Sequence, residues 1–188
     1  MLRVYDFDKT IFDGDSTARF VGYSLTKRPV LLMKLPRVLY HYIRLALGLE
    51  DKTRCKEVLY RALLGDFSRA ENEALVEAFW ARERGRIKAW YLAQKREDDL
   101  IISAGPSFLL EPICRELGVR LICSPVDVRG HAAGANCGGG EKVRRFRAAG
   151  FGDPFEFYSD SLVDAPMAAI ASKAYRVRGD RISDWPGR

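Results

Sequence analysis

Few residues of this sequence are of the kinds that build metal clusters or disulfide frameworks. The 188 residues include 4 cysteines and 2 histidines. The cysteines are widely spaced and form no Cys-x-x-Cys pair, which argues against a zinc knuckle and a disulfide framework. They are Cys55, Cys114, Cys123 and Cys137. His41 and His131 have no metal-ligating residue at a useful spacing. We therefore expect reduced thiols, and histidines that are structural or solvated.

Targeting signals and long uninterrupted apolar stretches are also lacking. The first residues, Met1 to Asp6, do not form the charged segment, apolar stretch and cleavage site of a signal peptide. The most apolar long stretch, residues 28–49, contains Pro36 and several cations, so a membrane-spanning helix is not expected. We predict a cytoplasmic protein, with peripheral contact to a membrane left open.

Acidic residues are scarce in one block of the chain. The formal net charge is +6, and residues 14–98 hold 17 Lys or Arg against 11 Asp or Glu, which accounts for all of it. Within this block, residues 14–49 carry six basic residues and a single acid, Asp15. Such a bias favours an anionic partner, whether a phosphate ester, an acidic lipid or nucleic acid. No aromatic-interleaved basic strand or known binding motif accompanies the charge, so nucleic acid is not expected.

Short apolar runs alternate with helical patterns over most of the chain. Strands are predicted at residues 2–5, 100–102, 119–123, 155–158 and 174–177. Helices are predicted after Ser107, as an N-cap, and over residues 142–149. This alternation predicts an α/β fold, a Rossmann-like parallel sheet with helices on both faces. Ligands bind such sheets at the carboxyl ends of the strands.

Residues 14–98 interrupt the alternation, because they contain helical patterns and no convincing strand. Asp15-Ser16-Thr17 can cap a first helix, and residues 54–64, 69–80 and 87–94 suggest others. We therefore predict an all-helical cap over residues 14–98. It would be inserted into a catalytic core made of residues 1–13 and 99–188.

The strongest chemical signal follows the first predicted strand, in Asp6-Phe7-Asp8-Lys9-Thr10. A continuing strand would hold the side chains of Asp6 and Asp8 roughly 7 Å apart along one face, so for both to act on the same phosphate the chain must turn after Asp6. Asp6 could then attack phosphorus and form an acyl phosphate, which divides hydrolysis into two easier displacements. Asp8 would protonate the leaving oxygen and later deprotonate water, which contributes roughly 10²- to 10⁴-fold to the rate.

Further polar residues follow other predicted strands. A carboxylate nucleophile and a phosphate repel each other, so the site needs a hard cation with oxygen ligands. Asp160 and Asp164 supply carboxylates for a magnesium site together with Asp6 and Asp8. Lys142 can neutralise a phosphate oxygen, while the Ser103 hydroxyl and the N–H of Ala104 can donate to another. The glycine run before Lys142 lacks the Gly-Lys-Ser/Thr ending of a P-loop.

Four motifs follow one another along the chain and resemble those of haloacid dehalogenase superfamily phosphatases. They are Asp6 to Thr10, Ser103, Lys142, and Asp160 with Asp164. The helical insert resembles the C1 cap of the phosphoserine-phosphatase-like subclass IB. The resemblance spans nearly the whole chain. It departs from the usual pattern at Lys9, where a small residue is frequent, and at Ser159 and Ser161, where glycines often flank the aspartate.

The resemblance implies a role for each motif residue. Asp6 would be nucleophile and metal ligand, and Asp8 would be acid and base with its carbonyl on magnesium. Thr10 and Ser103 would contact phosphate, and Lys142 would stabilise charge. Asp160 would be a direct metal ligand, and Asp164 would lie farther from the metal.

The substrate is less well defined by the sequence. Asp15 lies where phosphoserine phosphatases carry an acidic residue that meets a substrate ammonium, although Glu is usual there. Arg61 resembles their arginine for the substrate carboxylate. We predict a small phosphorylated metabolite as substrate. One alternative is a lipid head-group phosphatase acting on a phosphatidylglycerophosphate-like substrate at a membrane surface, and another is a non-catalytic protein that binds anionic surfaces.

Residues 28–49 leave two interpretations open. On a helical projection of about 100° per residue, three cations of this segment and its histidine fall within an arc of about 80°. They are Lys34, Arg37, His41 and Arg44. The segment could lie on acidic lipid head groups through this stripe. Alternatively, its apolar side packs inside the cap and the stripe faces solvent, which is the interpretation we favour.

Overall fold

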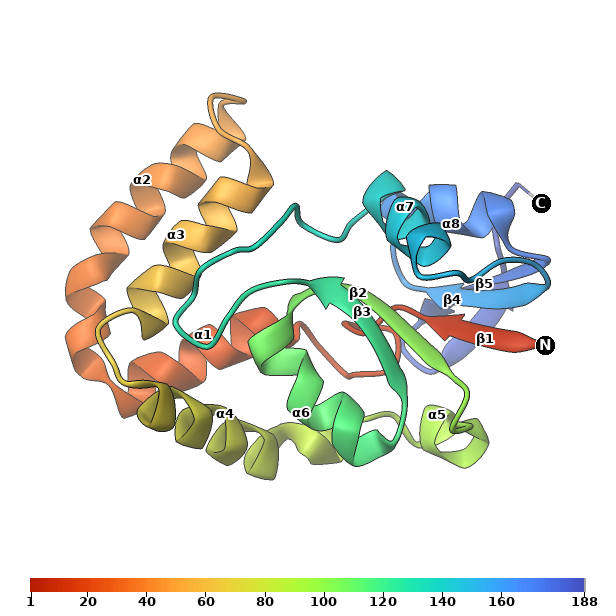
Figure 1. Ribbon diagram of the computed structural model, residues 1–188, viewed down its shortest axis with the longest axis horizontal. Coiled ribbons are helices and arrows are strands. Elements are labelled where there is room, and N and C mark those ends of the chain that lie inside the picture. The colour runs from red at the N-terminus through yellow and green to blue at the C-terminus, as the bar shows by residue number, and fades with distance from the viewer. Residues whose placement is uncertain (188) are drawn as a thin grey trace.

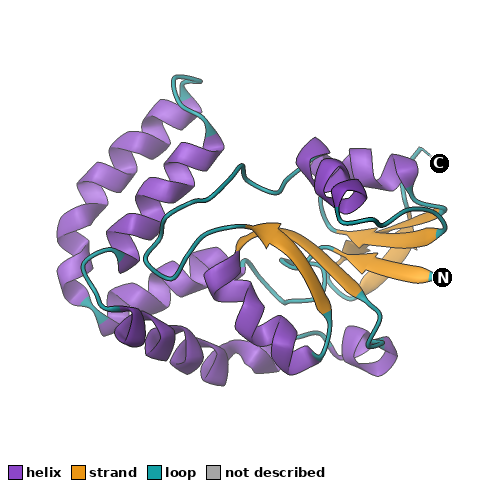
Figure 2. Ribbon diagram, viewed as in Figure 1, coloured by secondary structure: helices purple, strands orange, loops and turns teal. Residues whose placement is uncertain are grey.

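A computed structural model describes residues 1–187 and contains one six-stranded sheet in the order β3-β2-β1-β4-β5-β6 (Figures 1 and 2). The strands are β1 (Leu2–Tyr5), β2 (Leu100–Pro106), β3 (Arg120–Ser124), β4 (Phe155–Ser159), β5 (Lys173–Arg178) and β6 (Arg181–Asp184). Strands β1 to β5 are parallel, and β6 pairs with β5 in the antiparallel sense. The central strand β1 aligns Val4 with Leu100 of β2 and Tyr5 with Tyr158 of β4. The predicted α/β fold is confirmed.

Helices cover both faces of the sheet, because successive side chains of each strand point to opposite sides. On one face, Tyr5 and Ile101 share a core with Leu109 of α6 (Ser107–Leu117). On the other, Val4 and Ile102 pack in a second core with the helices α7 (Gly140–Ala148) and α8 (Ala165–Ile170). Figure 1 shows α7 and α8 on the opposite side of the strands from α6. The sheet is therefore the middle of three layers.

The insert between β1 and β2 is helical throughout. It contains α1 (Ser16–Lys27), the 3-10 helix η1 (Pro29–Lys34), α2 (Leu35–Ala46), α3 (Lys52–Leu64), α4 (Arg69–Glu83), the 3-10 helix η2 (Arg84–Arg86) and α5 (Ala89–Gln94). Asp15 caps α1, as the sequence predicts, by accepting a hydrogen bond from the Ala18 N–H at 2.8 Å. Within the insert, α5 packs on the sheet, since Tyr91 meets Tyr5 edge to face with ring centroids 5.0 Å apart. The domain division at residue 98 stays a prediction.

A long connection between β3 and α7 lies against the cap helix α3. At Gly130, a Cβ atom would come within 2.5 Å of the Tyr60 carbonyl carbon, so only glycine permits this approach. The N–H of Asn136 donates to the Thr53 hydroxyl of α3 at 3.2 Å. The side chain of Asn72, in α4, donates to the carbonyl of Val128 at 2.9 Å. Residues 125–139 thus connect the core to the cap helices α3 and α4 (Figure 1).

The structure differs from the sequence-based predictions in three places. First, β6 was not predicted, because its residues are all exposed and carry no buried apolar pattern. Second, Ser107 is not an N-cap but the first residue of α6, and its hydroxyl instead donates to the carbonyl of Val126 at 2.7 Å. Third, most apolar side chains of residues 28–49 do not pack inside the cap. Leu31 and Val38 are buried, but Leu39 and Leu47 are 60% and 66% exposed.

Other expectations from composition can be compared directly with the structure. All four cysteines are free thiols. His41 lies within 2.8 Å of a Glu50 carboxylate oxygen, which gives it a structural partner. None of the helices in residues 1–187 combines the length and the apolar character needed to cross a membrane.

Candidate active site

The predicted catalytic turn lies at the carboxyl end of β1. Asp6 still pairs with the neighbouring strand, since its N–H donates to the Tyr158 carbonyl at 2.9 Å. The chain then reverses, with the N–H groups of Ile11 and Phe12 donating to the carbonyl of Phe7 at 3.1 and 3.0 Å. Lys9 adopts a left-handed φ of 56° within this turn. The turn after Asp6 that the sequence requires is therefore present.

Lys142 bridges two carboxylates at the centre of the site. Its Nζ lies 2.6 Å from Asp6 Oδ1 and 2.8 Å from Asp164 Oδ2, and its side chain is only 2% exposed. Asp164 Oδ2 also accepts a hydrogen bond from the Ser159 hydroxyl at 2.7 Å. This network joins residues from four separate segments of the core. A buried ammonium with two carboxylate partners is one of the few arrangements in which such a charge is tolerated.

The charges of this network perturb one another. Burial raises the pKa of Asp6 to about 6, although Lys142 opposes the shift. Burial lowers the pKa of Lys142, but the two carboxylates outweigh it and hold that pKa above its ordinary value. Lys142 therefore remains charged at neutral pH, and Asp6 is a carboxylate whose negative charge is poorly solvated.

Asp8 lies in the turn after β1, next to the start of α1. Its Oδ1 accepts a hydrogen bond from the N–H of Ser16, at the start of α1, at 2.7 Å. Burial raises the pKa of Asp8 to about 7, while the hydrogen bonds from Ser16 oppose the shift. A carboxyl group with a pKa near neutrality can both give and accept a proton at physiological pH.

The remaining core motifs converge on the same edge of the sheet. The Thr10 hydroxyl accepts a hydrogen bond from the Asp160 N–H at 2.9 Å and lies 3.5 Å from Asp6 Oδ2. The hydroxyl of Ser103 accepts from the Gly105 N–H at 3.1 Å. Ala104, between them in sequence, lines the same cavity as Asp8. The parallel order of β2, β1 and β4 brings these residues together, because their carboxyl ends meet at one edge.

A cavity of about 550 Å³ lies between this edge and the cap. Its polar lining is Asp8, Asp15, Thr17, Lys52 and Lys56, and its apolar lining includes Val21, Leu35, Val38 and Leu59. Asp15 is thus at the cavity, although its Oδ1 is occupied as the helix cap of α1. The cavity has room for a small substrate, with carboxylates on the core side and cations from α3.

Lys56 is a candidate site residue that the sequence did not reveal. Its Nζ donates to the carbonyl of Ala104 at 2.8 Å and to Asn136 Oδ1 at 2.7 Å. Burial, with a smaller contribution from the neighbouring Lys52, lowers the pKa of Lys56 to about 8. Lys52 and Lys56 are one turn apart in α3, which is visible in the sequence. Which face of α3 turns toward the core is not.

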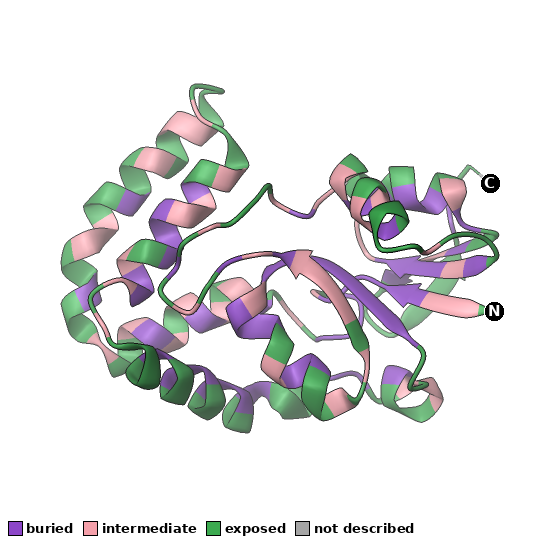
Figure 3. Ribbon diagram, viewed as in Figure 1, coloured by how far each residue is buried: buried purple, intermediate pink, exposed green. Residues whose placement is uncertain are grey.

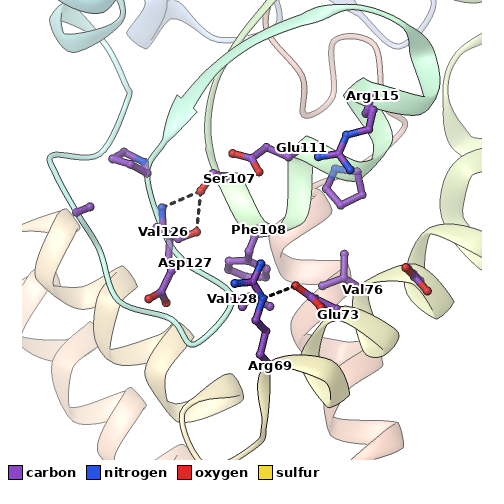
Figure 4. Close-up of a pocket in the computed structure, with 14 residues that line it drawn as sticks. Arg69, Glu73, Val76, Ser107, Phe108, Glu111, Arg115, Val126, Asp127 and Val128 are labelled. Carbon is purple, nitrogen blue, oxygen red and sulfur yellow. Dashed lines mark hydrogen bonds and ion pairs between the residues drawn. The ribbon is translucent and has the colours of Figure 1, made fainter.

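Arg61 is not brought to this cavity. It lines a separate hollow of about 400 Å³ together with Lys34, Arg37 and Arg54. A further hollow of about 610 Å³ lies between α4, α6 and the segment after β3 (Figure 4). Its charged lining mixes both signs, with Arg69, Glu73, Glu111 and Arg115, and it contains none of the predicted site residues.

The donor atoms of the site suit a hard cation such as magnesium. Among residues 1–187, no group of three or more His, Cys, Asp or Glu side chains is arranged as a metal cluster. Magnesium, however, is commonly held by one or two carboxylates, with waters completing its shell. Asp6 and Asp160 end the adjacent strands β1 and β4, and Asp160 contributes to raising the pKa of Asp6. A cation would relieve the charge of these two carboxylates, of which Asp6 is buried.

Comparisons with known proteins bear on the family and the fold. A family model described as haloacid dehalogenase-like hydrolase matches residues 4–169. A protein of unknown function from Bordetella pertussis Tohama I has a similar structure, with a TM-score of 0.77 and 22% identity over 92% of this chain and 87% of that one.

Two further solved structures have lower TM-scores and lower sequence identities. A phosphoserine phosphohydrolase-like protein from Francisella tularensis gives a TM-score of 0.51 and 16% identity over 92% of this chain and 84% of that one. A probable phosphoserine phosphatase from Vibrio cholerae gives 0.60 and 12% identity over 93% of this chain and 55% of that one. No curated protein matches the sequence. The family match covers most of the chain, and the chain belongs to the haloacid dehalogenase-like hydrolases.

Proposed function

We propose that this protein hydrolyses phosphate monoesters through an aspartyl-phosphate formed on Asp6, with magnesium as cofactor. The observation that carries the proposal is the buried bridge of Lys142 to Asp6 and Asp164 at the carboxyl end of the central strand. A buried carboxylate held by a cation is oriented for attack. The adjacent Asp8, with a pKa near 7, can handle the proton.

In the first step, a carboxylate oxygen of Asp6 attacks phosphorus and the ester oxygen leaves with a proton from Asp8. In the second, a water molecule gives its proton to Asp8 and attacks phosphorus, which releases inorganic phosphate and regenerates Asp6. Asp6, Asp160 and the main-chain carbonyl of Asp8 would hold a magnesium ion, whose charge offsets that of the nucleophile and the phosphate.

The remaining residues bind and orient. Lys142 stabilises charge on the phosphoryl group, and Thr10, Ser103 and the N–H of Ala104 contact its oxygens. Asp164, predicted among the metal ligands, accepts hydrogen bonds from Lys142 and Ser159 through a single oxygen. We assign it chiefly the positioning of Lys142.

A small phosphorylated metabolite is the substrate class that we favour, because the cavity between the core and the cap, of about 550 Å³, has room for one. Lys56 and Lys52 would attract a second anionic group of that substrate, the role that the sequence suggested for Arg61. The apolar wall of Val21, Leu35 and Val38 favours a second candidate, a lipid head-group phosphatase, since it could contact the apolar part of such a substrate.

The test is phosphate release from a panel of esters, including phosphoserine, sugar phosphates, nucleotides and phosphatidylglycerophosphate. We expect magnesium-dependent turnover that excess chelator abolishes. Asp6→Asn should lose several orders of magnitude on every ester while remaining folded. Asp13→Asn is the matched control, because Asp13 is an exposed aspartate just beyond the same turn. Turnover that survives in Asp6→Asn would contradict the proposal.

A further inference from the structure

The cap carries an apolar surface that nothing in residues 1–187 covers. It runs along η1, α2 and the turn that follows, and most of the large apolar side chains that the described chain exposes lie here. We define the outer face of α2 as Met33, Leu39, Tyr40, Ile43, Leu47 and Leu49. Met33 is 82% exposed and Ile43 51%. Figure 3 shows α2 coloured mostly as exposed or intermediate.

The pattern along α2 is that of an amphipathic helix with its apolar side outward. Leu39, Ile43 and Leu47 recur every four residues and therefore form one ridge. Arg37 and Arg44 lie seven residues apart along one edge of that ridge. An exposed apolar ridge of this size on a soluble surface marks an interaction site.

Charge indicates what this surface meets. Residues 16–49 contain no Asp or Glu at all. Acids from neighbouring elements pair with some of the cations, since Asp66 lies 2.5 Å from Lys34 and Glu50 lies 3.6 Å from Arg44. Arg37 is exposed and has no ion-pair partner in the part of the chain that the structure describes. The surface is therefore apolar with a basic edge, which complements an anionic one.

We propose that the outer face of α2 docks on a phospholipid bilayer with anionic head groups. A helix of 12 residues is about 18 Å long, so α2 fits in the plane of the interface and not across it. A second copy of the chain is less suitable, because a two-fold contact would use the same face of that copy, and residues 16–49 contain no acid to pair with Arg37. Figure 1 shows α2 at the margin of the molecule, where it can meet a flat lipid surface.

The docked face and the candidate active site share one helix. Leu35, Val38 and Tyr42 of α2 line the cavity that also contains Asp8. The outer face adjoins these residues on the same helix, since Leu39 lies four residues after Leu35 and three before Tyr42. Docking would therefore bring the cavity close to lipid head groups. This inference goes beyond the proposed function and does not depend on it, because the outer face contains no residue assigned to catalysis.

The test is sedimentation of the full chain with phosphatidylcholine vesicles, with and without phosphatidylglycerol. We expect wild type to sediment with the anionic vesicles, less with the neutral ones, and less at high salt, because the screening length falls from about 10 Å at 0.1 M to about 3 Å at 1 M. Replacing Leu39, Ile43 and Leu47 by Gln should weaken partitioning about fivefold each, or on the order of a hundredfold together. Arg37→Gln should weaken partitioning onto anionic vesicles about fivefold and leave partitioning onto neutral vesicles unchanged.

Leu92→Gln with Ile182→Gln is the matched control, because these apolar residues are also exposed but lie on other elements. It should bind as wild type does. Circular dichroism and hydrolysis of a soluble ester report folding and activity separately from docking. Wild type that ignores anionic vesicles at low salt, or a triple variant that binds them as well as wild type, overturns the proposal. Equal binding to neutral vesicles overturns the choice of an anionic surface. A wild-type dimer that the triple variant dissociates would assign the face to a second copy.

Discussion

Replacing Lys142 by Met should destabilise the fold and abolish activity through the same two contacts. Methionine keeps the length and apolar stem of the side chain but removes the ammonium, which is 2% exposed and lies 2.6 and 2.8 Å from two carboxylates. Asp6 and Asp164 would then be buried without a cation. Removing one partner of a buried ion pair typically costs about 3 to 5 kcal/mol. We expect the free energy of unfolding to fall by an amount near the lower end of this range, because the two carboxylates left without Lys142 can take up protons.

This escape by protonation predicts a pH dependence. The pKa of Asp6 is already about 6 with Lys142 in place, above the value of an unfolded aspartate, and should rise further in the variant. The native state then binds protons before the unfolded state does. The destabilisation should therefore be largest above pH 7 and shrink as the pH falls toward 4. Removing the second carboxylate as well, in Lys142→Met with Asp164→Asn, should recover part of the loss.

The measurement is urea unfolding followed by tryptophan fluorescence, in excess chelator so that no added metal ion bears on the result. Lys173→Met is the control, because Lys173 is an exposed lysine at the start of β5. We expect it to change the free energy of unfolding by less than about 0.5 kcal/mol. If Lys142→Met were no less stable than this control at pH 8, the bridging ammonium would not be what keeps Asp6 and Asp164 together.

Two further predictions concern proton transfer and substrate binding. Asp8→Asn should slow alkyl phosphates at least about a hundredfold more than nitrophenyl phosphate, whose leaving group scarcely needs a proton; similar losses on both would remove Asp8 from the acid role. Lys56→Met should raise KM, more than it lowers kcat, for esters that carry a second anionic group. Because burial lowers the pKa of Lys56 to about 8, wild-type KM for such esters should rise above that pH as the amine loses its charge, and Lys56→Met should lack this rise. A KM for these esters that neither the variant nor the pH changes would refute the assignment.

The proximity of three core residues could be predicted from sequence because it follows from the parallel arrangement of the strands. Asp6, Ser103 and Asp160 each follow an apolar run, and parallel strands bring such ends together whatever covers the sheet. The cap could not be predicted in the same way. Its helices were recognisable from their periodicity and their caps, as at Asp15, but periodicity does not say which side of a helix faces the core. Lys56 was therefore missed, and Arg61 was expected at a cavity that it does not line.

The outward apolar face of α2 illustrates the same gap between pattern and packing. A helical apolar ridge ordinarily predicts a buried side, and that expectation is wrong here for most of the ridge. Burial depends on whether another element lies opposite, and residues 1–187 place none there. The antiparallel strand β6 was not predicted for a related reason, since an edge strand that is exposed throughout has no alternating apolar pattern.

The close approach of Gly130 to Tyr60 has a consequence for protein engineering. Exchanging caps between relatives is an obvious way to transplant specificity, and the natural cut sites are the two ends of the insert. Here a foreign α3 would meet a connection shaped to its predecessor, with no space at Gly130 for a mismatch. The Asn72 and Thr53 contacts to that connection would be lost as well. We therefore expect a cap exchange to succeed only if residues 125–139 are exchanged together with the cap helices that they contact.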